Sequence, residues 1–443
     1  MEQKLDIKLS AGSIFLFTLP TIITILFTTI YAMVGSIFTA QLVNTNALSA
    51  INICAPIVNV TFGIGMMTAS GGNAIISKTI GEGDEVRARR IFSFLFYVTT
   101  LVGLVMCLLG LAFIKPIITF LGGSDPAVYE YCEKYLKTTL IFVPFDIAAV
   151  MLLFFSVTAG KAAMGTVIAI LGGVITIILD YVCISVMNMG IVGAALATGL
   201  GYAIPAVIGT LYFVFFRNAS LYFVSPLIEF KLLLKSCSNG ISELVSYLSG
   251  AVILLLFNIT VIKLRGSEGV AALTIILYGQ QIVSSVFMGF SSGVSPLISY
   301  NYGKKDTDNL KKVFKNAIKI VAVTALFLFT LAMVFGNSFA LIFSEKDSEV
   351  YNMAIYGFKI FSFAFLFMGF SVFSSAMFTA LSNGKISAVI SVMRTLLINA
   401  GCIIILSKIF GMNGIWISVP ISELLSLILS VFLIMKYKRT YNY

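Results

Sequence analysis

The sequence predicts an all-α polytopic membrane protein, with twelve transmembrane helices in two pseudo-symmetric six-helix lobes. Hydrophobic residues make up 59% of the chain and charged residues only 11%, whereas soluble domains carry about 25% charge. Residues 9–77 contain no charged side chain, which is long enough for two crossings of about 20 residues each. The third observation is a charged elbow that recurs after half the length of the chain.

Each long apolar run is expected to be a helix, because a bilayer offers no water to the polar groups of the backbone. Breaks at Gly, Pro, Asn and clusters of charge separate the runs. The twelve helices are expected at about 13–40, 48–77, 91–119, 136–158, 165–187, 190–216, 236–263, 269–299, 313–343, 355–381, 386–407 and 412–435.

The repeated elbow occupies residues 70–92 and 292–314. At a shift of 222 residues the identical pairs include Ser70 and Ser292, Gly71 and Gly293, Ser77 and Ser299, Gly81 and Gly303, Asp84 and Asp306, and Phe92 and Phe314. Six predicted helices separate the copies, so the two halves have the same orientation, as in transporters built from two bundles around an axis along the membrane normal. The longest inner connection, 217–235, divides an N-terminal lobe (1–222) from a C-terminal lobe (223–443).

The distribution of Lys and Arg predicts the orientation of the chain in the membrane. With the N-terminus inside, the inner segments hold 20 of the 29 basic residues and the outer segments hold 8. Both termini are therefore expected in the cytoplasm, in a multi-pass protein of the plasma membrane. The formal net charge of +10 follows from this topology and does not indicate a nucleic-acid partner.

Enzymatic chemistry and a metal cofactor are not supported. The chain has no His, and its six Cys are scattered without a CxxC pair, so no metal site or disulfide framework is indicated. No phosphate-binding P-loop is present, so ATP is not expected to drive the protein. Energy is left to an ion gradient, a partner or the gradient of the substrate.

Five ionisable residues fall inside predicted helices, where charges are costly and usually functional. Asp146 and Asp180 are each expected about seven residues below the outer end of their helices. Two neighbouring carboxylates in a low dielectric favour protonation of one of them, which suits a proton carrier. The alternative is a Na⁺ site with oxygen ligands, which Thr176 and Thr198 are placed to complete.

The second set of charges is Glu243, Arg394 and Glu423. One interpretation is a functional site; the other is a structural ion pair between Arg394 and one of the acids. Further polar residues within predicted spans are expected to face a cavity, namely Tyr31, Asn258, Tyr278 and Gln281.

The chain resembles the MATE (multidrug and toxic compound extrusion) family, and in particular its MepA-like bacterial branch, along essentially its whole length. The segments that carry the resemblance are GGNAIISKTIGEGD (71–84), GIVGAALAT (190–198), SELVSYLS (242–249), ISYNYG (298–303), FTALSNGKISAVISVMRT (378–395) and GIWISVPISELLSL (414–427).

This resemblance implies two lobes that open alternately to each side and export cationic or amphipathic compounds in exchange for H⁺ or Na⁺. Asp180, Thr198 and Glu243 match acidic and polar positions of the family. Two positions depart from it: YAMVG has Gly35 where the family has Asp, and Thr176 stands where the family has Asn. We hypothesise that Asp146 supplies the missing second carboxylate, or that coupling has moved to Glu243 in the C-terminal lobe.

The sequence therefore predicts a monomeric antiporter that exports small organic cations or amphipathic drugs and contacts membrane lipid, with no bound cofactor. H⁺ is the expected coupling ion and Na⁺ the alternative. Two other functions remain open. A lipid-linked saccharide flippase needs a basic cavity, for which the helices offer Arg394 alone. A transport-inactive sensor or scaffold would account for the missing acid in the first helix.

Overall fold

The computed structural model describes residues 5–42, 45–122, 126–217 and 219–443. Within these residues the chain is helical and has no β-strand. The elements are α1 (Ala11–Leu42), α2 (Thr45–Gly81), α3 (Glu85–Ala112), α4 (Ile114–Phe120), α5 (Pro126–Thr158), α6 (Ala162–Asp180), η1 (Tyr181–Val186), α7 (Gly190–Phe215), α8 (Phe230–Gly303), α9 (Thr307–Leu341), α10 (Glu349–Phe361), η2 (Ser362–Ala364), α11 (Phe365–Ala380), α12 (Gly384–Val392), η3 (Met393–Ile398), α13 (Asn399–Phe410) and α14 (Met412–Tyr441).

Helix α8 contains two membrane crossings. Its 74 residues would extend about 110 Å as one straight helix, several times the thickness of a bilayer. The backbone turns at Gly266, where φ is +62° and ψ is −152°, a conformation that glycine adopts without the clash of a Cβ atom. Elsewhere α3 with α4, α6 with η1, α10 with η2 and α11, and α12 with η3 and α13 each form one crossing. In the described part of the chain, the twelve predicted spans are confirmed.

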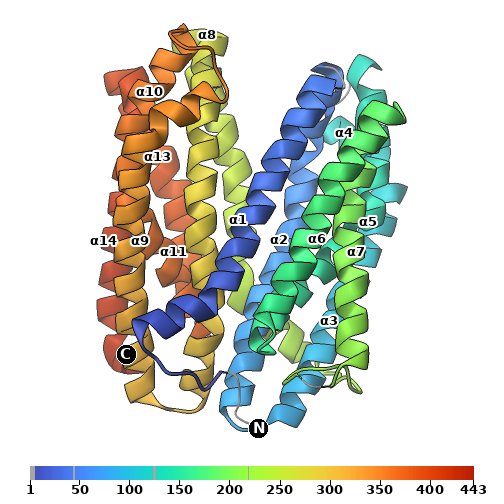
Figure 1. The fold of residues 1–443 in the computed structure, drawn as a ribbon, viewed down its shortest axis with the longest axis vertical. Helices are drawn as coiled ribbons and strands as arrows, with labels where there is room; N and C mark the ends of the chain where they lie inside the picture. The colour runs from blue at the N-terminus through green and yellow to red at the C-terminus, as the bar shows by residue number, and fades with distance from the viewer. Residues whose placement is uncertain (1–4, 43–44, 123–125, 218) are drawn as a thin grey trace.

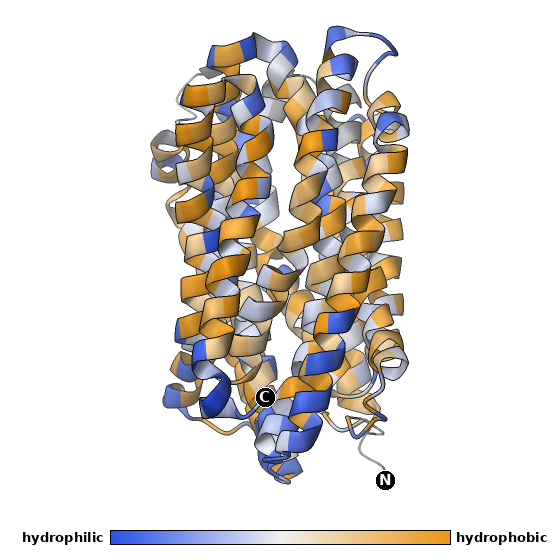
Figure 2. Cartoon of the chain, turned by 90° about the vertical axis from the view of Figure 1, so that its left-hand side faces the viewer, coloured by the Kyte–Doolittle hydropathy of each residue, from blue (hydrophilic) through white to orange (hydrophobic). Residues whose placement is uncertain are grey.

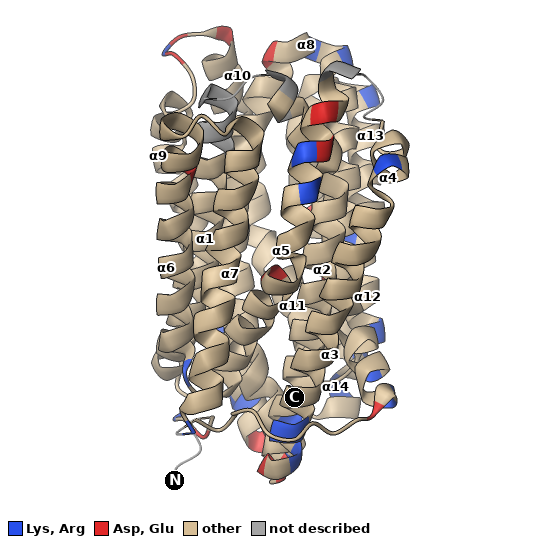
Figure 3. Ribbon diagram, turned by 90° about the vertical axis from the view of Figure 1, so that its right-hand side faces the viewer, with Lys and Arg blue, Asp and Glu red and all other residues tan. Residues whose placement is uncertain are grey.

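The crossings form two bundles that lie close together at the end with the termini and diverge toward the opposite end (Figure 1). The outer surface is apolar along the middle of the helices (Figure 2). Lys, Arg, Asp and Glu gather at the two ends (Figure 3). This is the surface expected of helices that face lipid in the middle and water at both ends.

The repeated elbow has the same local structure in both halves. Asp84 caps α3 by accepting a hydrogen bond from the backbone N–H of Arg87 at 2.9 Å. Asp306 caps α9 by accepting from the backbone N–H of Asn309 at 3.0 Å. A side-chain acceptor at this position satisfies one of the free N–H groups of the first turn, which explains why both copies keep Asp.

The paired glycines of the elbow bring the two halves into backbone contact. A Cβ on Gly81 of α2 would lie 2.1 Å from the carbonyl oxygen of Tyr300 in α8, and one on Gly303 would lie 2.1 Å from the carbonyl oxygen of Lys78. Helices can approach this closely only where no side chain intervenes. The contact is reciprocal, and it holds the lobes together near the end with the termini.

Helix α5 corrects one expected boundary. We expected its start near residue 136, but it begins at Pro126. The added turns carry ion pairs between Glu130 and Lys134 and between Glu133 and Lys137, each 2.6 Å long. Ion pairs between residues i and i+4 stabilise a helix independently of apolar packing. The charged segment, at which the apolar run ends, therefore continues the helix. Asp146 therefore lies twenty residues from the first residue of α5, instead of the expected seven or so.

Candidate functional site

Asp180 lies in the core of the N-terminal lobe and faces helix α1. It is 2% exposed and is the last residue of α6 before the π-helical turn η1. Such turns re-aim side chains and are frequent at functional sites. A Cβ on Gly35 of α1 would lie 3.2 Å from Oδ2 of Asp180. Gly35, at which the sequence departs from the pattern that the resemblance implies, therefore lies next to Asp180.

Small residues allow α6 to sit close to its neighbours around Asp180. A Cβ on Gly173 would lie 2.5 Å from the ring of Tyr31 in α1, and one on Gly201 of α7 would lie 1.8 Å from Oγ1 of Thr176. Thr176 is buried and lies one turn before Asp180, on the same face of the helix. Its hydroxyl donates to the carbonyl of Gly172 at 3.0 Å, which leaves the lone pairs of its oxygen available.

Asp146 lies at a different depth from Asp180. Counted from the short turn between α5 and α6, Asp146 is twelve residues away and Asp180 eighteen, which corresponds to about 18 Å and about 27 Å of helix. The expectation of similar depth is thus wrong. It assumed that α5 begins near residue 136, whereas α5 begins at Pro126. The participation of Asp146 in ion coupling stays a prediction.

Tyrosines surround Asp146. Its Oδ1 atom is buried without a hydrogen-bond partner among the described residues. The side chains of Tyr31 and Tyr202 lie within electrostatic range of this carboxylate. Tyr247 of α8 lies within electrostatic range of both Asp146 and Glu243, so it is near an acid of each lobe.

The C-terminal lobe contains a cavity of about 270 Å³. The first and second crossings of α8 line it together with α11, α12 and η3. The lining residues are Glu243, Ser246, Tyr247, Ser284, Met288, Ser291, Ser292, Val372, Ser375, Ala376, Ser391, Arg394 and Thr395. Eight of the thirteen lining residues carry a hydroxyl group, and the lining has one acid and one base.

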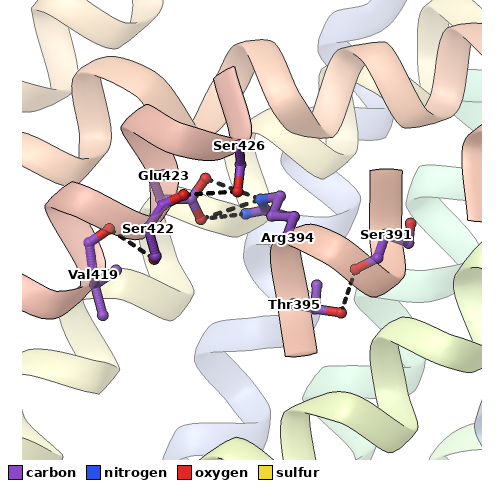
Figure 4. A network of polar contacts seen from close by, with 7 residues as sticks. All are labelled: Ser391, Arg394, Thr395, Val419, Ser422, Glu423 and Ser426. Atoms are coloured by element: carbon purple, nitrogen blue, oxygen red, sulfur yellow. Dashed lines mark hydrogen bonds and ion pairs between the residues drawn. The ribbon is translucent and has the colours of Figure 1, made fainter. Parts of the chain in front are cut away.

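Arg394 lines the cavity and forms an ion pair with Glu423, which is not one of the lining residues. The Nε atom of Arg394 donates to both carboxylate oxygens of Glu423 at 3.1 and 3.0 Å, and Nη2 donates to Oε1 at 2.9 Å. Figure 4 shows the two side chains facing each other, with Arg394 on η3. The structure therefore forms the ion pair expected between Arg394 and one of the two acids, and the partner is Glu423 rather than Glu243.

Glu243 also lines this cavity. Among the residues that the structure describes, no side chain forms a hydrogen bond or an ion pair with its carboxylate. Because the Arg394–Glu423 pair is neutral as a unit, an ionised Glu243 gives the cavity a net negative charge. The cavity is therefore suited to a cation or a proton.

The other candidate residues lie away from this cavity. Tyr31 is buried in the N-terminal lobe, Thr198 of α7 is exposed, Asn258 is half-buried and Gln281 is exposed. Tyr278 packs with its ring 5.5 Å from that of Phe343. Their roles stay predictions. The sequence analysis missed the serines of the cavity, because small polar residues are ordinary in transmembrane helices.

The two lobes, their parallel repeat and the acids inside them define a membrane transporter built from two six-helix bundles. A model of the MatE family matches residues 20–182 and 244–405, so the match falls once in each half and covers most of the chain. The chain belongs to the MatE family.

Relatives and solved structures agree with this assignment. The chain is 28% identical over 421 residues to the multidrug export protein MepA of Staphylococcus haemolyticus, covering 94% of this chain and 92% of the relative. It is 27% identical to MepA of Staphylococcus saprophyticus, covering 92% and 89%. A crystal structure of a MATE protein in complex with MaL6 has a similar fold, with a TM-score of 0.92, 20% identity and 99% of each chain covered. An outward-facing MATE transporter matches with the same TM-score and identity, over 99% of this chain and 98% of its own.

Proposed function

We propose that this protein exports cationic or amphipathic organic compounds in exchange for cations, with H⁺ as the coupling ion and Na⁺ as the alternative. The observation that carries the proposal is the state of the membrane-buried charges. Asp146, Asp180 and Glu243 have no cationic partner within ion-pair distance among the described residues, whereas Arg394 is neutralised by Glu423. The names of the MepA relatives, multidrug export proteins, favour the same substrates.

Exchange follows when the substrate cation and the coupling ion compete for the same carboxylates. A carboxylate that holds a proton no longer attracts an organic cation, so loading one releases the other. Alternating access of the two lobes then couples the two movements, because only differential binding in the two states shifts the equilibrium between them. The reciprocal contact of Gly81 and Gly303 holds the two lobes together, and so closes the space between them, on the side of the termini.

The excess of basic residues in the segments on the side of the termini supports a cytoplasmic location for both ends. With that orientation the lobes diverge toward the outside (Figure 1). The arrangement corresponds to the outward-facing half of the cycle. We infer a monomer, because each lobe contributes its own buried acids within one chain.

The alternative of a lipid-linked saccharide flippase is less favoured. Recognition of a pyrophosphate requires several free basic groups. The base that lines the cavity described above, Arg394, gives two of its three nitrogens to Glu423. A transport-inactive scaffold is the other alternative, and a transport measurement separates it from the exporter.

The test is transport of ethidium by the purified protein in proteoliposomes, with H⁺ and Na⁺ gradients imposed separately. We expect ethidium to accumulate against its gradient when protons can flow in the opposite direction, and not when Na⁺ alone is supplied. Accumulation with Na⁺ alone would assign the coupling to Na⁺. No accumulation under either gradient would contradict the exporter.

A further inference from the structure

The segment that leads into α1 contacts the opposite lobe. Residues 5–10, which we name the N-terminal strap, precede the first crossing of the N-terminal lobe and run along the end of the molecule with the termini (Figure 1). Asn316 of α9 donates a hydrogen bond from Nδ2 to the carbonyl oxygen of Leu9 at 2.7 Å. Lys304, which follows α8, forms an ion pair with Asp6 at 3.5 Å. The strap therefore joins the start of α1 to the C-terminal lobe.

A small number of contacts hold the strap in place. Leu5 is 3% exposed and belongs to the hydrophobic core, and burial of apolar surface is the dominant favourable term in folding. The ion pair contributes little, because the side chains of Lys304 and Asp6 are 41% and 59% exposed and water screens such pairs. Segments held by few buried contacts open at low cost in free energy, so the strap is suited to release and return.

The internal repeat places the linker between the lobes on the equivalent surface of the N-terminal lobe. At the shift of 222 residues Leu5 corresponds to Leu227, whose backbone N–H donates to a backbone carbonyl of α3 at 3.2 Å. The ring of Phe230 lies 6.4 Å from that of Phe94, and the counterpart of Phe94 in α9 is Asn316. The third crossing of each lobe thus contacts the segment that leads into the first crossing of the other lobe.

The linker differs from the strap because its contacts stay within one lobe. The backbone N–H of Val224 donates to Oγ of Ser93 in α3 at 3.0 Å. The ring of Phe223 stacks on that of Phe92, with 4.8 Å between their centroids. Both contacts fix the linker to the N-terminal lobe, to which the preceding helix α7 also belongs. They are therefore expected to persist when the two lobes move apart.

Helix α1 passes from one lobe to the other after the strap. A Cβ on Gly289 of α8 would lie 2.5 Å from the Cα atom of Ile22, so the first turns of α1 pack on the C-terminal lobe. The hydroxyl of Thr24 donates to that of Thr166 in α6 at 2.9 Å, so the helix packs on the N-terminal lobe from there on. Separation of the lobes on the side of the termini must therefore break the contacts of the strap or those of the later turns of α1.

We propose that the N-terminal strap holds the lobes together on the side of the termini, and that it leaves α9 each time the lobes open on that side. This inference rests on the alternating access of the proposed function. The strap binds across the lobes only while they are closed there, so its contacts favour the outward-facing arrangement over the inward-facing one. The buried contacts between α1 and α6 stay intact, because the strap is held less firmly than they are.

A reversible disulfide tests whether the strap must be released. The double variant Leu9→Cys with Asn316→Cys joins the strap to α9 after oxidation with copper phenanthroline, and a phosphine reductant reopens the bond. We expect ethidium efflux in proteoliposomes to fall to the rate of vesicles without protein on oxidation, and to return on reduction. The matched control is Ser93→Cys with Val224→Cys, which joins the linker to α3 within one lobe and should keep its efflux rate when oxidised.

The variant Asn316→Ala tests the strap in the opposite direction, by removing its hydrogen bond to Leu9. We expect the population with separated lobes to rise about fivefold, the effect of one net hydrogen bond. Spin labels on the exposed positions Glu82 and Lys305 measure this population in the detergent-solubilised protein. Lys8→Gln changes an exposed residue of the strap and should leave the distance distribution unchanged.

Unchanged efflux after oxidation of the Leu9→Cys and Asn316→Cys protein would overturn the inference, and so would a wild-type distance distribution in Asn316→Ala. Equal loss of efflux in the Ser93→Cys and Val224→Cys control would also overturn it, because the effect would then not depend on a contact between the lobes. The distance measurement requires no transport. If no form of the protein exports ethidium but Asn316→Ala still separates the lobes, the exporter is wrong and the role of the strap remains.

Discussion

A Cβ atom on Gly35 would lie 3.2 Å from Oδ2 of Asp180. The resemblance to the family implies an Asp at position 35, so this chain has a hydrogen where that side chain would meet Asp180 of α6. We therefore expect a cation at this point of the N-terminal lobe to be bound by one carboxylate, and more weakly than between two acids.

The variant Gly35→Asp is expected to restore the second carboxylate beside Asp180. Two carboxylates with the buried oxygen of Thr176 form an oxygen-rich site that suits a hard cation such as Na⁺. We therefore expect an inward Na⁺ gradient to stimulate ethidium efflux severalfold in this variant but not in the wild-type protein. The measurement is the initial rate of efflux in proteoliposomes with and without Na⁺ at constant pH.

The matched control is Gly35→Asn, which adds a side chain of nearly the same size without the charge. Na⁺ should leave its efflux rate unchanged. If Na⁺ stimulates Gly35→Asp and Gly35→Asn equally, the effect comes from filling the space and not from the carboxylate.

Asp180→Asn and Asp146→Asn test which acid of the N-terminal lobe carries the coupling ion. Each amide keeps the shape of the side chain but does not exchange a proton. We expect both variants to lose pH-driven ethidium efflux, down to the rate of vesicles without protein. Full pH-dependent efflux in Asp146→Asn, with loss in Asp180→Asn, would show that Asp146 does not replace the acid missing at position 35.

The fold was predictable because apolar runs and their breaks follow directly from the cost of exposing the backbone to lipid. The elbow was predictable for the same kind of reason, since Asp84 and Asp306 cap helices and Gly81 and Gly303 contact the other lobe. The length of α5 was not, because Glu130 and Lys134 end an apolar run but continue a helix through their ion pair.

The candidate site was predictable only in part. Charges inside helices stand out in a sequence, and Asp180, Glu243 and Arg394 were found in this way. Arg394 pairs with Glu423 because of how each helix is rotated about its own axis, which sets the direction of its side chains. The π-helical segment η3 changes this rotation locally at Arg394. The serine-rich wall comes from helices far apart in the sequence, so no local pattern marks it.

The pair of Arg394 and Glu423 predicts an asymmetric stability result. Arg394→Met leaves Glu423, which is 5% exposed, as a buried charge without its partner, and we expect a loss of about 3–5 kcal/mol. Arg394→Met combined with Glu423→Gln should recover most of this loss, because no charge is then left unpaired. Thermal unfolding in detergent measures both, and equal losses in the single and double variants would contradict an energetic pairing.

The reciprocal glycine contact predicts how the lobes close on the side of the termini. Alanine at both Gly81 and Gly303 would place each Cβ 2.1 Å from a carbonyl oxygen, so α2 and α8 must move apart by about 1 Å to reach the 3.0 Å that real Cβ atoms keep. We expect the separated arrangement to gain population and efflux to fall severalfold. Spin labels on the exposed positions Glu82 and Lys305 report the separation as a longer distance distribution.

Gly250→Ala is the control, because no atom lies within 4 Å of its added Cβ. A wild-type distance distribution in the double variant would show that the contact does not hold the closed side, because the added methyl groups would then have been accommodated without any movement of the lobes.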